Sequence, residues 1–148
     1  MLIDNPSIGT VDIDPHKIIH FPKGLVGMPD CKDWALLAPI DGSYFHWLQS
    51  VDRPELMFVV TEPSRFAPDY HVDLSPNTIQ DVGLEKLEDA TLLVIVNQEG
   101  QFLTGNLQGP LLINVARYTG CQLVLPRQQY NTRHVLMELR HNQQSLAA

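Results

Sequence analysis

Short apolar runs, several of which alternate with polar residues, form the main pattern along the chain. Residues 8–13 have the sequence Ile-Gly-Thr-Val-Asp-Ile, and a two-residue period of this kind is typical of a strand with one buried face. Similar apolar or alternating runs predict eight further strands, at residues 17–21, 35–40, 45–51, 57–61, 91–97, 111–116, 122–125 and 134–139. The last run also suits a helix, because Leu136, Met137 and Leu139 could share one helical face.

Turn-forming residues separate these runs. The chain contains eleven prolines and nine glycines, and Asp41-Gly42 predicts a tight hairpin turn because glycine adopts positive φ without strain. One helix is predicted at residues 76–82, where Ser75 can cap it, Pro76 suits its first position and Gly83 can end it. A second helical turn is expected at residues 84–87.

The arrangement of these elements predicts the fold class. A parallel α/β sheet needs a crossover helix between successive strands, and the chain has too few helical segments for that. We therefore expect a mostly β, single-domain small antiparallel β-barrel or sandwich with one or two short helices. Its 148 residues fit one domain, which we place at residues 1–141, followed by a flexible C-terminal tail at residues 142–148.

The ends and the apolar runs of the chain bear on its location. The N-terminus has neither a basic segment nor a long apolar segment of the kind found in signal peptides. The longest apolar run, at residues 92–96, is far shorter than the ~20 residues of a membrane-spanning helix. Cys31 and Cys121 are far apart in sequence and are expected to remain thiols in a reducing compartment. We expect a cytoplasmic protein that does not associate with membranes.

The chain is acidic, with a formal net charge of -7. A protein of this charge is not expected to bind a phosphate backbone directly, because nucleic-acid-binding proteins present basic patches. The negative charge can serve solubility alone, or it can favour a partner with a basic surface. The sequence leaves both interpretations open.

Motifs for chemistry are missing from the sequence. Six histidines are present, but they form neither a Cys/His cluster nor an H-E-x-x-H pattern, so we expect no metal site. A G-x-S-x-G nucleophile motif and a nucleotide-binding glycine pattern are also lacking. We expect no catalytic residue and no cofactor. An enzyme remains open as an alternative, because residues distant in sequence can converge in the folded chain.

Three stretches carry a more specific pattern. They are residues 21–28, a strand end that runs into a loop bent by Gly24 and Gly27; residues 47–60, a strand, a turn and a second strand; and residues 104–114, a polar turn that leads into an apolar strand. Together with Thr61-Glu62-Pro63, Gln122-Leu123-Val124-Leu125 and Tyr130, they make the chain resemble the FliW family of flagellar assembly factors over roughly residues 1–136. Met28 stands where the family usually has phenylalanine, and Gly105, which is expected to loosen the turn, stands where it usually has alanine.

The resemblance implies a binding protein rather than an enzyme. A member of this family is expected to bind cytoplasmic flagellin, through the C-terminal region of flagellin, as a chaperone. In competition with flagellin it is expected to bind and antagonise CsrA, an RNA-binding translational regulator, and so to control flagellin synthesis. We expect a monomer, with weak self-association left open. The alternatives are a β-barrel that binds a small ligand or carries out hydrolysis, and a structural subunit that only self-associates.

The resemblance and the chemistry of the residues together suggest where partners bind. The C-terminal segment of flagellin is apolar and helix-forming, so we predict an exposed apolar groove near residues 25–28 or beside the strand at residues 58–61. Gln49 could be a contact or a buried amide, and Asn106 a contact or a turn-forming residue. The candidate partner-binding residues are Leu25, Val26, Met28, Gln49, Asp52, Phe58, Glu62, Asp69 and Asn106.

Overall fold

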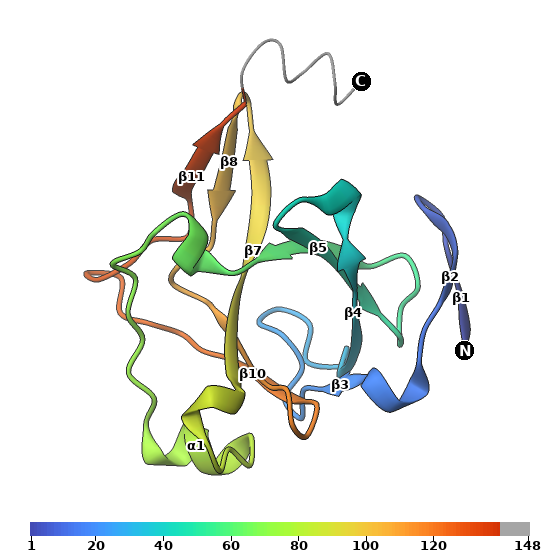
Figure 1. Cartoon of the computed structure of the whole chain (residues 1–148), viewed down its shortest axis with the longest axis horizontal. Coiled ribbons are helices and arrows are strands. Elements are labelled where there is room, and N and C mark those ends of the chain that lie inside the picture. Colours follow the sequence, from blue (N-terminus) through green and yellow to red (C-terminus); the bar gives the residue numbers. More distant parts are fainter. Residues whose placement is uncertain (140–148) are drawn as a thin grey trace.

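Strands dominate the fold (Figure 1). The computed structural model describes residues 1–139. The strands are β1 (Leu2–Asn5), β2 (Gly9–Asp12), β3 (Ile19–His20), β4 (Asp33–Pro39), β5 (Phe45–Ser50), β6 (Met57–Thr61), β7 (Ala90–Glu99), β8 (Phe102–Gly105), β9 (Leu111–Asn114), β10 (Thr119–Gln122) and β11 (His134–Glu138). The helical segments are α1 (Pro76–Asp81) and the 3-10 turns η1 (Pro15–Lys17), η2 (Ile40–Gly42), η3 (Pro63–Arg65) and η4 (Leu87–Asp89). The prediction of a mostly β protein is confirmed.

Seven strands close into a barrel through the long strand β7. The order β7-β6-β5-β4-β3-β10-β9 is completed by pairing of β9 with β7, so the sheet returns to its starting strand. The C-terminal part of β7 continues past the ring and pairs with β8, which in turn pairs with β11 (Figure 1). These pairs are antiparallel except for β3 and β10, which run parallel at the single register pair His20 and Thr119.

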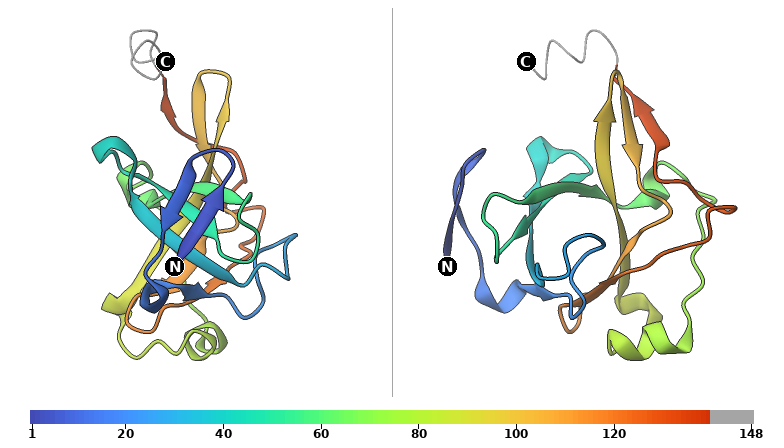
Figure 2. Two further views of the ribbon diagram at one scale, coloured as in Figure 1. Left: turned by 90° about the vertical axis from the view of Figure 1, so that its right-hand side faces the viewer. Right: turned by 180° about the vertical axis from the view of Figure 1, so that it is seen from behind.

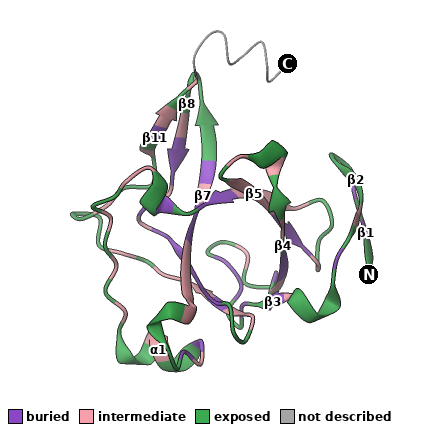
Figure 3. Cartoon of the chain, viewed as in Figure 1, coloured by how far each residue is buried: buried purple, intermediate pink, exposed green. Residues whose placement is uncertain are grey.

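The main core fills the interior of this barrel. Trp34, Phe21, Leu48 and Val60 have no exposed surface, and buried residues gather on the ring strands (Figure 3). Gly120 is required for this packing, because a Cβ at that position would lie 2.7 Å from the ring of Phe21. The apolar residues of the predicted strands therefore form a closed core, as expected for strands whose inward faces are removed from water.

The single α-helix forms where its capping signals predict it. The Ser75 side chain accepts a hydrogen bond from the Thr78 N–H, Pro76 occupies the first turn, and Gly83 follows the helix with φ of +65°. Val82 is the C-cap, so the helix is one residue shorter than predicted. The second helical turn is the 3-10 segment η4, which starts where the predicted segment at residues 84–87 ends.

Two predicted strands depart most from the bounds that the structure shows. Of residues 17–21, only Ile19–His20 form a strand, because the Asp14 side chain caps a 3-10 turn by accepting the His16 N–H. The strand predicted at residues 122–125 lies instead at Thr119–Gln122. Its ladder with β9 ends at Gln122, where the partner Leu111 is preceded by Pro110, a residue with no N–H to donate.

Local patterns left three strands unassigned or ambiguous. The ambiguous run at residues 134–139 contains a strand, β11, because it pairs with β8. Strand β8 itself was not predicted, and neither was β1, which pairs with β2 as a separate two-stranded sheet. Figure 2 shows this hairpin at the flank of the barrel, where Ile3 packs against Ala35 and Ile13.

The domain boundary predicted at residue 141 and the tail predicted at residues 142–148 lie outside the described residues. Among the helices that the structure does describe, none has both the length and the apolar character to cross a membrane.

Candidate functional site

An apolar groove opens on one side of the barrel and has a volume of about 380 Å³. Its walls come from the loop after β3, the middle of β6 and β7, the segment between β8 and β9, and the segment that leads from β10 to β11. The lining residues are Leu25, Val26, Met28, Phe58, Ile95, Asn106, Gln108, Gly109, Gln122, Val124 and Thr132.

The first wall is a loop with a tight turn at its tip. The backbones of Leu25 and Met28 exchange hydrogen bonds of 3.3 and 2.8 Å, and Gly27 between them has φ of +82°. Glycine is also required at position 24, because its φ is +65° and a Cβ would lie 2.4 Å from the Met28 carbonyl oxygen. The turn leaves Val26 at its tip with 64% of its surface exposed, as an apolar lip on the groove.

The second wall is an insertion in the strand pairing of β7. Only two residues of β7 separate Leu93 from Val96, whereas five residues separate their partners Leu111 and Gly105. The extra residues, 106–110, connect β8 to β9, and none of them is exposed. The Asn106 N–H donates to the Ile95 carbonyl at 3.0 Å, and the Asn106 Oδ1 accepts the Gly109 N–H at 2.9 Å.

The third wall, residues 123–132, is held by hydrogen bonds to the chain beneath it. The N–H groups of Leu107 and Gln108 both donate to the Asn131 carbonyl, and the Leu125 N–H donates to the Gln108 carbonyl. The Tyr70 hydroxyl donates to the Leu107 carbonyl at 2.6 Å, and its ring meets Tyr130 edge-on at a centroid distance of 4.6 Å. Burial, together with the neighbouring Tyr130, raises the pKa of Tyr70, so the hydroxyl remains a donor across the neutral pH range.

The groove has the chemistry of a binding surface. None of its lining residues is titratable, and the polar groups that face it are amides and one hydroxyl. A smaller polar hollow adjoins it past Ile95, Asn106 and Thr132, where Arg133 lies 3.7 Å from Glu99. Within residues 1–139 the structure contains no group of three or more His, Cys, Asp or Glu side chains arranged to hold a metal ion. Such a surface can bind an apolar side of another molecule.

Five of the nine predicted contact residues line this one groove, namely Leu25, Val26, Met28, Phe58 and Asn106. The two locations predicted for an apolar groove, at residues 25–28 and beside β6, are thus two sides of a single feature. Leu25 is 3% exposed and forms part of the floor, whereas Met28 and Phe58 are half-buried and pack on the barrel core. The other candidates do not line the groove.

Gln49 is a buried structural amide, which resolves the alternative that its sequence context left open. It has no exposed surface, its Oε1 accepts a hydrogen bond from Asn5 at 2.7 Å, and its Nε2 donates to carbonyls of the turn that follows β5. A residue enclosed in this way cannot contact a partner on the outside of the barrel, so Gln49 is removed from the candidate contacts.

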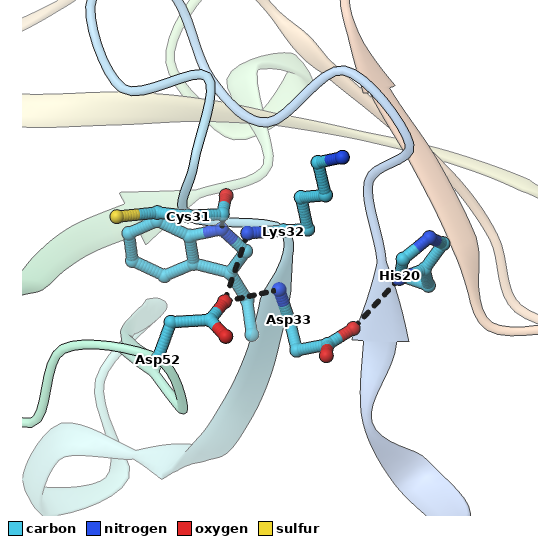
Figure 4. Close-up of polar contacts among 6 residues, drawn as sticks. His20, Cys31, Lys32, Asp33 and Asp52 are labelled. Atoms are coloured by element: carbon cyan, nitrogen blue, oxygen red, sulfur yellow. Dashed lines mark hydrogen bonds and ion pairs between the residues drawn. The ribbon is translucent and has the colours of Figure 1, made fainter.

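The three acidic candidates, Asp52, Glu62 and Asp69, are all exposed. Asp52 accepts the N–H groups of Lys32 and Asp33 at 2.9 and 3.0 Å, and so caps the start of β4 (Figure 4). In the same corner the Asp33 carboxylate pairs with the His20 ring at 2.7 Å. Glu62 lines a different hollow, which it shares with Tyr70. The sequence suggested these residues for their charge, and one of them, Asp52, has a clear structural role as well.

The groove also contains residues that the sequence did not single out as contacts. They are Ile95, Gln108, Gly109, Gln122, Val124 and Thr132. Gln122 and Val124 belong to a stretch that contributes to the resemblance to the family, and that resemblance was the sequence signal that could have identified them. Ile95 had no such signal, because its sequence context is that of an ordinary core residue in a strand. The expectation that Gly105 loosens a turn is wrong, because Gly105 lies in β8, where it pairs with Val96 of β7 and His134 of β11. A Cβ at this position would lie 3.1 Å from Leu136.

Comparison with known proteins agrees with these features. The FliW protein family profile matches residues 2–136. The flagellar assembly factor FliW of Natranaerobius thermophilus is 38% identical over 139 residues, which cover 92% of each chain. That of Geotalea uraniireducens is 34% identical over 147 residues, covering 98% of this chain and 90% of the relative.

A solved structure has the same fold. The crystal structure of a flagellar assembly factor FliW superimposes with a TM-score of 0.86 at 32% sequence identity, covering 95% of this chain and 99% of that one. Because the family profile, the relatives and the solved structure each cover nearly the whole chain, this protein belongs to the FliW family of flagellar assembly factors.

Proposed function

We propose that this protein binds flagellin in the cytoplasm as a chaperone and, in competition with flagellin, binds and antagonises the translational regulator CsrA. Free flagellin would then occupy the protein, release CsrA and lower flagellin synthesis. Membership of the FliW family supports a role in flagellar assembly. The observation that carries the flagellin part of the proposal is the exposed apolar groove.

The groove suits an apolar helical segment of the kind expected at the C-terminal end of flagellin. Val26 and Val124 both line the groove and are 64% and 72% exposed, which is unusual for valine. Phe58 and Met28 add half-buried apolar surface to the same groove. An amphipathic helix that lays its apolar face into this groove removes both apolar surfaces from water, and full burial of one valine is worth about 1.5–3 kcal/mol.

The acidic surface suits a basic partner such as the RNA-binding face of CsrA. The net charge of -7 would speed association with a positive surface, and exposed Asp52, Glu62 and Asp69 are the contact residues that we propose for it. Attraction between exposed charges is screened over about 8 Å at physiological ionic strength. Binding of CsrA should therefore weaken with added salt more than binding of flagellin does.

The alternative of a small-ligand-binding or hydrolytic barrel finds less support. Hydrolysis requires a nucleophile or an acid–base pair beside the substrate, and the groove is lined by apolar and amide groups. We therefore propose a binding protein without catalytic activity.

A charge placed in the groove tests the proposal. Val124→Asp puts a carboxylate on the apolar wall, and Leu87→Asp is a matched control, because Leu87 is 73% exposed on η4 and does not line the groove. We expect Val124→Asp to weaken flagellin binding at least about tenfold by calorimetry, and Leu87→Asp to bind like the wild type. Equal binding by both variants would remove the groove from the proposal, and absence of wild-type binding to flagellin and to CsrA would overturn the function as a whole.

A competition experiment tests the regulatory part. Labelled CsrA is bound first, and flagellin is then added in increasing amounts while the bound fraction is followed by fluorescence anisotropy. We expect flagellin to displace CsrA from the wild type but not from Val124→Asp at the same concentrations. Formation of a stable ternary complex with no loss of CsrA would contradict competition.

A further inference from the structure

We propose that Gln122 is the positioning residue of the groove: its side-chain amide ties the Val26 lip to the turn at Gly109 and so sets the separation of two walls. The consequence for flagellin affinity rests on the proposed function, whereas the placement of the lip does not.

The amide makes one hydrogen bond to each wall. Its Oε1 accepts the Val26 N–H at 2.7 Å, and its Nε2 donates to the Gly109 carbonyl at 3.0 Å. The two backbone partners define the orientation of the amide, because an N–H can only donate and a carbonyl can only accept. A single side chain thus connects loops that lie 96 and 13 residues away from it in sequence.

The backbone of Gln122 provides a fixed base for this connection. Gln122 is the last residue of β10 and pairs with Leu111 at the start of β9. The lip, by contrast, is the tip of a turn, where Val26 is largely exposed. Because the strand is held by its ladder and the turn tip is not, the amide positions the lip relative to the barrel rather than the reverse.

Glycine at position 109 makes room for the amide. A Cβ on Gly109 would lie 3.0 Å from the Nε2 of Gln122 and 3.0 Å from the Nδ2 of Asn106. The backbone there does not have positive φ, so the need for glycine comes from this close approach and not from backbone conformation. A methyl group at position 109 should therefore displace the Gln122 amide and, through it, the Val26 lip.

The test uses variants that separate the two hydrogen bonds. Gln122→Glu keeps an oxygen that can accept the Val26 N–H but loses the donor to the Gly109 carbonyl. Gln122→Leu loses both, and Gln108→Leu is the control, because Gln108 lines the same groove. Amide hydrogen exchange of Val26 in the free protein is followed by NMR, together with the affinity for flagellin.

We expect Val26 exchange to accelerate about fivefold in Gln122→Leu, the factor that corresponds to one hydrogen bond of ordinary net strength. Exchange should stay close to the wild-type rate in Gln122→Glu and in Gln108→Leu. Gly109→Ala should accelerate Val26 exchange by displacing the Gln122 amide, and it provides the test if Gln122→Leu fails to fold. Flagellin affinity should fall in Gln122→Leu and Gly109→Ala by a similar factor.

Unchanged Val26 exchange in both Gln122→Leu and Gly109→Ala would overturn the inference. If exchange follows the expected order but the wild type does not bind flagellin, the positioning role of Gln122 stands and the proposed function fails. If flagellin binds the wild type and Gln122→Leu equally while exchange differs, the lip position does not control affinity, and that part of the inference is wrong.

Discussion

The apolar groove and the corner around Asp52 were both suggested by the sequence as interaction regions, and they are built differently. In the groove, a neutral amide from Gln122 holds the walls, and Val26 and Val124 are left largely exposed. In the corner, the charged candidate Asp52 itself caps two backbone N–H groups. The apolar candidates gather because the barrel closes beneath them, whereas exposed carboxylates gain no burial by coming together.

The largest effect is expected at the base of the groove lip. Gly24→Ala places a Cβ 2.4 Å from a backbone oxygen at φ of +65°, so the loop must move, and we expect a loss of about 3 kcal/mol in the free energy of unfolding. Gly27→Ala, at φ of +82° with nothing within 4 Å of the added Cβ, should cost about 1 kcal/mol. Urea denaturation measures the free energy of unfolding of both variants. Equal losses would show that the loop can move away from the close contact at position 24 without further cost.

A second prediction concerns the third wall and alkaline pH. Because burial raises the pKa of Tyr70 above its ordinary value near 10, the neutral hydroxyl stabilises the fold below about pH 10, and this contribution is lost as pH rises further. Tyr70→Phe removes the bond to the Leu107 carbonyl, at a cost of about 1 kcal/mol at pH 7. In denaturation experiments between pH 8 and pH 11, the free energy of unfolding should fall more steeply for the wild type than for Tyr70→Phe. Parallel falls would contradict a raised pKa of Tyr70.

The corner offers a matched test of charge against structure. Asp52→Ala leaves the N–H groups of Lys32 and Asp33 without their carboxylate, which should lower stability by about 1 kcal/mol. Flagellin affinity should not change, because Asp52 does not line the groove. CsrA association at low salt should slow by a small factor, measured by stopped-flow fluorescence. A large loss of flagellin binding would show that flagellin contacts the corner around Asp52 as well as the groove, and would contradict this prediction.

The smallest effect is expected at Gly105. Alanine there would place its Cβ 3.1 Å from Leu136, so that side chain must shift by a few tenths of an ångström, at a cost of about 0.5 kcal/mol. Leu136→Val should remove part of the conflict, so the double variant should be more stable than the sum of the single changes predicts. Thermal denaturation of the four proteins gives the coupling, and strict additivity would show that the two positions do not compete for space.

Much of the secondary structure could be predicted because its causes are local. The strand Met57–Thr61 has the predicted bounds, and the helix starts at Pro76 after its Ser75 cap as expected. The turn at Asp41-Gly42 also forms, with both residues at positive φ and the Ser43 N–H bonded to the Ile40 carbonyl. Each of these features depends on residues that are neighbours in sequence, so periodicity, capping and turn chemistry were sufficient.

The sequence by itself determined a β-rich chain, its capped helix and the stretches that place it in its family. Tertiary structure alone decided that β9 returns to pair with β7, that Gln49 turns inward, and that Leu25, Phe58 and Asn106 meet around one groove. The physical reason is that strand periodicity shows which face of a strand is buried but not which strand lies beside it. Pairing depends on how the whole core closes, and the groove exists only after that closure.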